Sequence, residues 1–417
     1  MAKRLIWALI GGLVLQVTSF AQITAEDDLA GRDGSRIIST AVPFLTISPD
    51  ARAAGMADVG VATTPDANAT YWNPAKLPFI KEGSGDDYDM GFALSYTPWL
   101  RKLINDMSLS YLTGYKRLRE EEVISASLLY FNLGSMTFRD NNNVITGEHN
   151  PREFAFNVAY SRKLSNNLGL ALGLKFIRSN LAGSISIGPG NTQTKPGHTA
   201  AADVSVYYNK EKVAVAGRLF DIALGANLSN VGAKISYTNN DQADFIPTNL
   251  KLGFAATTEI DAYNKITLAV DANKLLVPTP PTYLADTTDE DGNKIVDQGR
   301  DPDETGLIGG MFGSFADAPG GFSEEMKEFM ISIGAEYWYD DLLAVRAGYY
   351  FESQIKGNRK YFTLGLGVRY NNFGIDFSYL IPVRQNNPLQ DTLRLSLIFN
   401  IKDKTPNIGG NSIGDDS

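Results

Sequence analysis

The sequence predicts an all-β protein, and specifically a 14-stranded antiparallel transmembrane β-barrel with an N-terminal hatch. Three observations lead to this fold. Segments of roughly 10–12 residues alternate large apolar with small or polar side chains, and that length crosses a bilayer when a strand is tilted. Short and long connections alternate between these segments, as in outer-membrane barrels. An export signal precedes them. A secreted β-sandwich would not explain the alternation of the connections.

The first 21 residues have the three parts of a secretory signal peptide. Lys3 and Arg4 form the basic region, Leu5–Val17 the apolar region, and Ser19 and Ala21 supply the small residues before the cleavage site. We therefore expect cleavage after Ala21 and export of residues 22–417. No later run of apolar residues is long enough to form a membrane-spanning helix, which excludes a helical membrane protein.

The segment between the signal and the first strand is predicted to fold inside the barrel. Residues 22–36 are polar and are expected to form a mobile N-terminal segment. Residues 37–87 contain turn-forming Pro and Gly, do not alternate, and are too apolar to remain in water, so we predict a hatch in the lumen. Within it, Ser48–Asp50 can cap a short helix from Ala51 to about Met56. The hatch residues that we single out are Phe44, Arg52, Asp66, Trp72, Asn73 and Pro74.

The barrel itself is predicted over residues 88–401. In residues 168–176, LGLALGLKF, the large apolar side chains point one way and Gly, Ala and Lys point the other way. Small inward residues such as Gly169, Ala171 and Gly365 leave room for a plug or a ligand, whereas a diffusion porin would carry opposed rows of charge. The predicted strands are 89–98, 106–116, 122–132, 152–162, 168–178, 200–209, 213–228, 248–259, 263–273, 329–339, 342–352, 360–370, 372–381 and 391–401.

The connections are expected to alternate between tight periplasmic turns and longer outer loops. The predicted turns are 116–121, 163–167, 210–212, 260–262, 340–341 and 371. The longest outer loop is 274–328, and an even strand number places both termini in the periplasm, with residues 402–417 as a periplasmic tail. Tyrosines near strand ends are expected to form interfacial girdles; they are Tyr96, Tyr111, Tyr130, Tyr160, Tyr207, Tyr337, Tyr339 and Tyr370.

The composition gives little support for an enzyme. The chain has no Cys and two His, and its net charge of −9 argues against nucleic acid as a partner. Its G-x-S-x-G match, Gly410–Gly414, lies in a polar tail without the strand and helix that a nucleophile elbow needs. We therefore predict no enzyme activity, no catalytic residues and no cofactor. Loop residues Asp289 and Asp291 fit a calcium loop, but Thr287 and Gln298 occupy positions where such a loop carries acids, so the segment is either a solvated acidic loop or a Ca²⁺ site at extracellular calcium concentrations.

Two outer connections carry large apolar residues and are candidates for partner or cargo contacts. In the first, the residues are Trp99, Leu100, Leu103 and Ile104, which either enter the outer leaflet or contact a partner barrel. In the loop 274–328 they are Leu307, Ile308, Met311, Phe312, Phe315 and Phe322. This second group either folds back over the barrel mouth or inserts into a partner through a few apolar anchors. A brief helix is expected at Ser323–Phe329.

Two blocks of sequence resemble a known family. Thr40–Lys76 contains TAVPFLTISPDARAAGMADVGVATTPDAN followed by WNPAK, and Leu94–Leu100 reads LSYTPWL. These blocks resemble the PorV family of the type IX secretion system. More broadly, the small-residue stretch and Asn73-Pro74-Ala75 are similar to FadL-type outer-membrane transporters, which are fourteen-stranded barrels plugged by an N-terminal segment.

The resemblance implies a location in the outer membrane of a Gram-negative bacterium and a function in protein secretion. It implies association with a SprA-type translocon, binding of the C-terminal signal domains of secreted cargo, and delivery of cargo to a PorU-type sortase and its attachment-complex proteins. Outer-membrane lipid surrounds such a protein. The main alternative is a hydrophobic-compound transporter like FadL. A lesser alternative is lipopolysaccharide deacylation, for which the sequence supplies no evident nucleophile–base pair.

Overall fold

A computed structural model of the protein describes residues 36–80, 89–102, 104, 106–139, 143, 145–181, 183, 186–187, 192–238, 243–288, 294–384 and 387–401. Several predictions therefore lie outside the described residues. These are the signal peptide, residues 22–35, hatch residues 81–87, the tail 402–417, Leu103, and the loop residues Asp289 and Asp291. In the part of the chain that is described, no helix has the length and hydropathy needed to cross a membrane.

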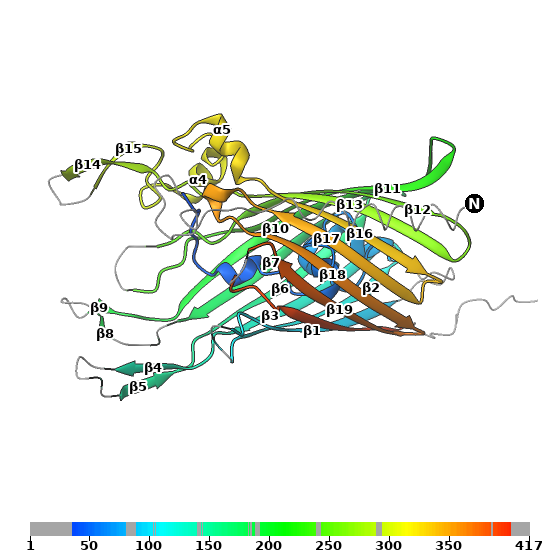
Figure 1. The fold of residues 1–417 in the computed structure, drawn as a ribbon, viewed down its shortest axis with the longest axis horizontal. Coiled ribbons are helices and arrows are strands. Elements are labelled where there is room, and N and C mark those ends of the chain that lie inside the picture. The colour runs from blue at the N-terminus through cyan, green and yellow to red at the C-terminus, as the bar shows by residue number, and fades with distance from the viewer. Residues whose placement is uncertain are drawn as a thin grey trace, which may run out of the picture. The chain divides into compact units, whose positions relative to one another are not determined.

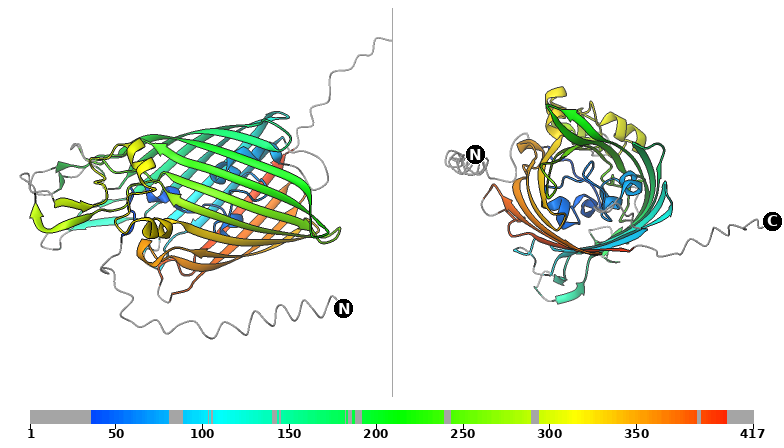
Figure 2. Two further views of the ribbon diagram at one scale, coloured as in Figure 1. Left: turned by 90° about the horizontal axis from the view of Figure 1, so that it is seen from above. Right: turned by 90° about the vertical axis from the view of Figure 1, so that its right-hand side faces the viewer.

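Within the described residues, fourteen antiparallel strands form a closed barrel, which confirms the predicted fold class (Figures 1 and 2). The strands are β1 Met90–Pro98, β2 Ser108–Arg119, β3 Glu122–Asn132, β6 Arg152–Lys163, β7 Leu168–Asn180, β10 Gly197–Val215, β11 Arg218–Gly232, β12 Asn249–Glu259, β13 Asn264–Leu275, β16 Met330–Tyr339, β17 Leu343–Phe351, β18 Lys360–Tyr370, β19 Phe373–Pro382 and β20 Leu393–Ile401. Pairing of β1 with β20 closes the barrel.

Short turns lie at one end of the barrel and long connections at the other, so the short-turn end is periplasmic. Three two-stranded hairpins rise from the outer end (Figure 1). They are β4 Met136–Arg139 with β5 Ile145–His149, β8 Ser186–Ile187 with β9 Thr192–Gln193, and β14 Thr282–Thr288 with β15 Lys294–Gln298. The brief helix expected at Ser323–Phe329, before β16, is present as α5 Phe322–Glu325 and η5 Met326–Glu328.

One predicted turn is wrong. The polar run 210–212 lies inside β10, which continues to Val215. The register shifts between Lys210 and Val213, and Lys212 has a φ of 55°, so this run is a β-bulge. The turn follows at Ala216 and Gly217, whose φ values of 50° and 79° suit a tight hairpin. The lysines mark the end of the apolar band rather than the end of the strand.

The two faces of the wall alternate as predicted, but two of the predicted girdle tyrosines are on the inner face. Leu172 and Leu174 on β7 point outward and are 65% and 73% exposed. Ala171, the residue before Leu172, points inward and is buried. Tyr111 and Tyr207 were expected in the girdles but are buried in the lumen. A tyrosine near a strand end joins a girdle only if it lies on the outward face, and these two share the inward face of their strands.

Residues 36–80 lie inside the barrel (blue in Figure 2) and cross it from one end to the other. Their elements are η3 Pro43–Thr46, α2 Ala51–Ala54, α3 Ala69–Trp72 and η4 Pro74–Phe79. Asp50 caps α2, because its Oδ2 accepts a hydrogen bond of 2.9 Å from the Ala53 N–H. The helix begins where the sequence predicts and ends at Ala54, before Met56.

The hatch runs from the outer mouth to the periplasmic end of the barrel; the N-terminus itself, which we expect in the periplasm, lies outside the described residues. The backbone N–H of Arg36 donates to the carbonyl of Ile355 in η6 Gln354–Lys356, an outer connection, at 3.0 Å. At the other end, Arg117 near the periplasmic end of β2 donates to the carbonyl of Ile80 at 3.1 Å. The chain therefore enters the lumen at the outer mouth and leaves it at the periplasmic end. The even strand number places the start of β1 and the end of β20 at the periplasmic end, but it does not determine the direction of the segment before β1.

Cysteine labelling checks this direction, because the chain contains no Cys of its own. Ile37 is 55% exposed next to Arg36. In intact cells, the Ile37→Cys variant should therefore react with a membrane-impermeant maleimide. An Asn372→Cys variant in the periplasmic turn between β18 and β19 should react only after the outer membrane is permeabilised. Labelling of Ile37→Cys only after permeabilisation would show that the direction is reversed.

Candidate functional site

Glycines on the inner wall allow the hatch backbone to lie directly against the strands. A Cβ atom at Gly348 of β17 would lie 2.3 Å from the carbonyl carbon of Met56. One at Gly225 of β11 would lie 2.5 Å from the Val61 carbonyl oxygen. Gly169 of β7 has the same relation to a hatch carbonyl in η4. Only glycine allows backbone to approach this closely. The small lumen residues seen in the sequence therefore accommodate the hatch.

A chain of buried charges connects the hatch to the barrel wall. Arg52 of α2 donates to both carboxylate oxygens of Glu336 on β16, at 3.0 and 2.8 Å, and to Asp66 of the hatch at 2.9 Å. Glu336 also accepts from Arg346 of β17 at 2.6 Å, and Arg346 donates to Asp376 of β19 at 2.7 Å. Buried ions are tolerated when each has a partner, and loss of one partner is costly. These pairs therefore fix α2 against three strands.

Two aromatic hatch residues are packed rather than exposed. Phe44 of η3 is stacked on Phe131 of β3, with ring centroids 6.2 Å apart. Trp72 of α3 donates its indole N–H to Asp50 at 2.6 Å. Asp50 therefore both caps α2 and joins it to α3. These contacts hold the helical pieces of the hatch together.

Asn73 and Pro74 connect the hatch to the opposite side of the wall. The Asn73 amide donates to the Val61 carbonyl at 3.1 Å and to the Val206 carbonyl of β10 at 2.9 Å. The Pro74 carbonyl accepts from the Ser161 hydroxyl of β6 at 2.8 Å. The predicted hatch residues thus contact the wall or one another through specific polar bonds, which is the arrangement of a fixed plug.

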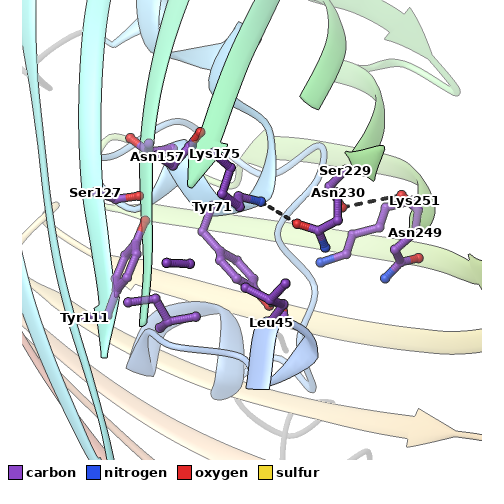
Figure 3. Close-up of a pocket in the computed structure, with 13 residues that line it drawn as sticks. Leu45, Tyr71, Tyr111, Ser127, Asn157, Lys175, Ser229, Asn230, Asn249 and Lys251 are labelled. Atoms are coloured by element: carbon purple, nitrogen blue, oxygen red, sulfur yellow. Dashed lines mark hydrogen bonds between the residues drawn. The ribbon is translucent and has the colours of Figure 1, made fainter. Parts of the chain in front are cut away.

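Two hollows border the hatch. An enclosed cavity of about 30 Å³ lies between hatch and wall, with Tyr71, Tyr111 and Lys251 among its lining residues (Figure 3). A hollow of about 1220 Å³ lies at the periplasmic end, where residues of the short turns such as Asp340 form its rim and Arg52 of the hatch borders it. The enclosed cavity holds small guests of about the size of water, whereas sites for drug-sized ligands measure about 300–1000 Å³.

The loop 274–328 forms a platform at the outer mouth from α4 Leu307–Gly313, α5 and η5. Its inner face is packed, because Met311 is buried and Gly310 lies against Phe245 and Pro278. Leu307 is half-buried. Its outer face carries four exposed side chains, which we call the outer apolar patch: Ile308, Phe312, Phe315 and Phe322, exposed by 58, 68, 44 and 78%. The loop therefore folds back over the mouth and still presents apolar residues.

Buried ion pairs hold this platform in place. Lys274 at the end of β13 pairs with Glu325 at 3.1 Å and also with Glu328. Lys356 of η6 pairs with Glu324 at 2.7 Å and with Glu328 at 2.8 Å. The platform helices are thus joined to the wall through β13 and to a second outer connection through η6.

Glu324 also joins the platform to the hatch, since it pairs with Arg36. Burial of the Glu324 carboxyl raises its pKa, but hydrogen bonds from Arg36 and Lys356 outweigh this and lower the pKa to about 2. Because the pKa of Glu324 is lower in the folded state, this carboxyl stabilises the fold fully above its ordinary pKa of 4.5, and the stabilisation is lost progressively as the pH falls to about 2. The junction therefore remains charged at neutral pH.

The first outer connection does not resemble the platform. Trp99, Leu100 and Ile104 are partly buried and pack against the cluster that contains Phe44. The Arg394 guanidinium lies 5.8 Å from the Trp99 ring centre. These residues therefore pack partly inward, and their contact with lipid or a partner stays a prediction.

The charged wall residues that hold the hatch were not identified from the sequence. Glu336, Arg346 and Asp376 lie at inward positions of predicted membrane strands, and that placement is a usable signal, because a charge inside a plugged barrel needs a partner. Within the described residues, no group of three or more His, Cys, Asp or Glu is arranged to hold a metal ion.

Comparisons with known proteins give one family. The family model described as type IX secretion system protein PorV matches residues 30–282. No curated protein matches the sequence. Among solved structures, the chain is similar to the Pseudomonas putida toluene transporter TodX, with a TM-score of 0.45, 11% identity, and coverage of 84% of this chain and 96% of that chain. It is also similar to a Pseudomonas aeruginosa FadL homologue, with a TM-score of 0.44, 11% identity, and coverage of 88% and 99%.

Proposed function

Since the chain belongs to the PorV family, and is thus an outer-membrane component of a Gram-negative type IX secretion system, we propose that it carries secreted proteins across the cell surface without passing them through its lumen. In this proposal it binds the C-terminal signal domain of cargo that emerges from a SprA-type translocon. It then delivers the cargo to a PorU-type sortase and its attachment-complex proteins. No catalytic step or cofactor is required.

The observation that carries the proposal is the outer apolar patch on its fixed platform. Phe312 and Phe322 are largely exposed, although buried ion pairs beneath them hold the backbone in place. Exposed apolar groups on a rigid support lose little entropy on binding, so they suit a protein partner. A few such aromatic anchors supply most of the binding energy in many interfaces.

The plugged lumen supports carriage over transport of a hydrophobic compound. The hatch is joined to two separate parts of the wall, to β16 through Arg52 and to β10 through Asn73, and the cavity beside it measures about 30 Å³. A FadL-type function would require these contacts to break for each ligand. Deacylation would require a nucleophile beside a base, and the sequence supplies no evident pair of this kind.

Substitution of the two most exposed anchors tests the proposal. The Phe312→Ser, Phe322→Ser double variant should lose translocon and cargo recovery by at least about tenfold in pull-downs from detergent extracts, because anchor residues each contribute about 2 kcal/mol or more. Barrel formation should be unchanged, since neither side chain is buried. These substitutions are more specific than deletion of Leu307–Phe315, which also removes the packed Met311.

Tyr283→Ser is the matched control, because Tyr283 is an exposed aromatic residue on the outer hairpin β14–β15. Its recovery of partners should equal that of the unaltered protein. If the double variant recovers translocon and cargo as well as the control does, the outer apolar patch is not the contact. Recovery of the unaltered protein alone, with a fatty acid in the lumen, would contradict the carrier function as a whole.

A further inference from the structure

The enclosed cavity between hatch and wall has an uneven charge balance. Lys175 of β7 and Lys251 of β12 both line it, and no Asp or Glu of the described residues does (Figure 3). The hatch contributes η3 and α3 to one side through Leu45 and Tyr71. Strands on opposite sides of the barrel supply the rest. A cavity with two amines and no acid on its surface is suited to an anion.

Only one of the two lysines forms a salt bridge among the described residues. The Lys175 ammonium lies 3.0 Å from Asp203 and donates to Asn230 at 2.5 Å. Lys251 forms no salt bridge within the described part of the chain, although its side chain is buried. Its Nζ instead lies 4.8 Å and 4.6 Å from the ring centres of Tyr71 and Trp72. The Asp271 carboxylate attracts this ammonium without forming a salt bridge with it, and a buried ammonium with no directly bound acid favours a counter-ion.

Polar atoms without partners border the same cavity. The Tyr111 hydroxyl and the side-chain carbonyls of Asn157 and Asn249 are buried and have no hydrogen-bond partner among the described residues. An unsatisfied buried polar group costs about 1–3 kcal/mol. Three such groups on one cavity indicate a guest. An anion can accept from Lys251, and water beside it can accept from the Tyr111 hydroxyl and donate to the amide oxygens.

From this geometry we propose that the cavity binds one small monovalent inorganic anion, of the halide class, together with water. The volume of about 30 Å³ accommodates guests of this size, and it is too small for a lipid or a peptide carboxylate. The ion neutralises Lys251 of β12 beside hatch residue Tyr71, and the accompanying water binds the Tyr111 hydroxyl of β2. This site stabilises the plug and does not depend on the proposed secretion function.

Bromide diffraction on the unaltered protein tests the site directly. Crystals grown with bromide in place of chloride should show an anomalous peak within hydrogen-bonding reach of the Lys251 Nζ. Density in the cavity without an anomalous signal would mean ordered water only, and would overturn the proposal. This measurement requires no variant to fold.

A thermal measurement tests whether the ion matters for stability. At constant ionic strength, with gluconate replacing chloride, the unfolding midpoint of the unaltered protein should rise with the logarithm of chloride concentration. The Lys251→Met variant should lose this dependence, and Tyr111→Phe, which removes only a hydroxyl, should weaken it. Lys163→Met is the control, because the Lys163 Nζ lies 4.8 Å from the ring of hatch residue Phe79 but does not border the cavity. A chloride-independent midpoint in the unaltered protein would contradict the proposal.

Discussion

The Glu336→Gln variant should unfold at a much lower temperature than the unaltered protein. Glu336 is buried and accepts hydrogen bonds from both Arg52 and Arg346. Removal of its charge leaves two buried guanidinium groups sharing the remaining carboxylates of Asp66 and Asp376. Breaking a buried ion pair in this way typically costs about 3–5 kcal/mol. The loss is measured as the temperature at which the fast-migrating folded form converts to the unfolded form on a detergent gel.

Glu122→Gln is the matched control for this substitution. Glu122 lies 3.8 Å from Arg119 and from Arg162, which are exposed to solvent. Such surface pairs contribute about 0–1 kcal/mol, so the conversion temperature should change little. Equal conversion temperatures for Glu336→Gln and Glu122→Gln would show that the buried charges do not hold the hatch.

The second large effect is expected from Gly348→Val, which should convert the plugged barrel into one that conducts ions. A Cβ at this position would lie 2.3 Å from the carbonyl carbon of Met56 and 2.6 Å from the backbone nitrogen of Ala57. These are backbone atoms, so no side-chain rotation relieves the clash. The hatch must therefore move away from β17. Single-channel recording in planar bilayers should show conductance that the unaltered protein lacks.

Gly306→Ala serves as the control for glycine replacement. No atom lies within 4 Å of a Cβ built at Gly306, and its φ is −74°. This variant should be as closed as the unaltered protein. If Gly348→Val is equally closed and equally stable, the hatch does not depend on close contact with the wall.

The strands were predictable because their pattern is local. Alternation over residues 168–178 anticipated β7 almost to its end at Asn180, and the facing of each residue followed from the period of two. The turn at 210–212 failed because a polar run can mark either a turn or the edge of the apolar band. Tyr111 and Tyr207 failed because a position near a strand end does not decide which way a side chain points.

Partners distant in the sequence could not be predicted. Arg52 and Glu336 are 284 positions apart, and their pairing depends on how the hatch is placed in the closed barrel. Trp99 and Phe312 are both apolar residues in outer connections, yet the first packs inward and the second is exposed. Only their neighbours in space distinguish them. The resemblance to a family gave the function, whereas the periodicity gave only the barrel.

The direction of the hatch has a consequence for the order of folding events. Arg36 is held at the outer mouth while Ile80 is held at the periplasmic end. A segment anchored in this way cannot be threaded easily through a wall that is already closed, because the glycine contacts leave no clearance. We therefore expect the hatch to be in position before β1 and β20 pair. On this view it is a folding template, and formation of the β1–β20 seam is the last step.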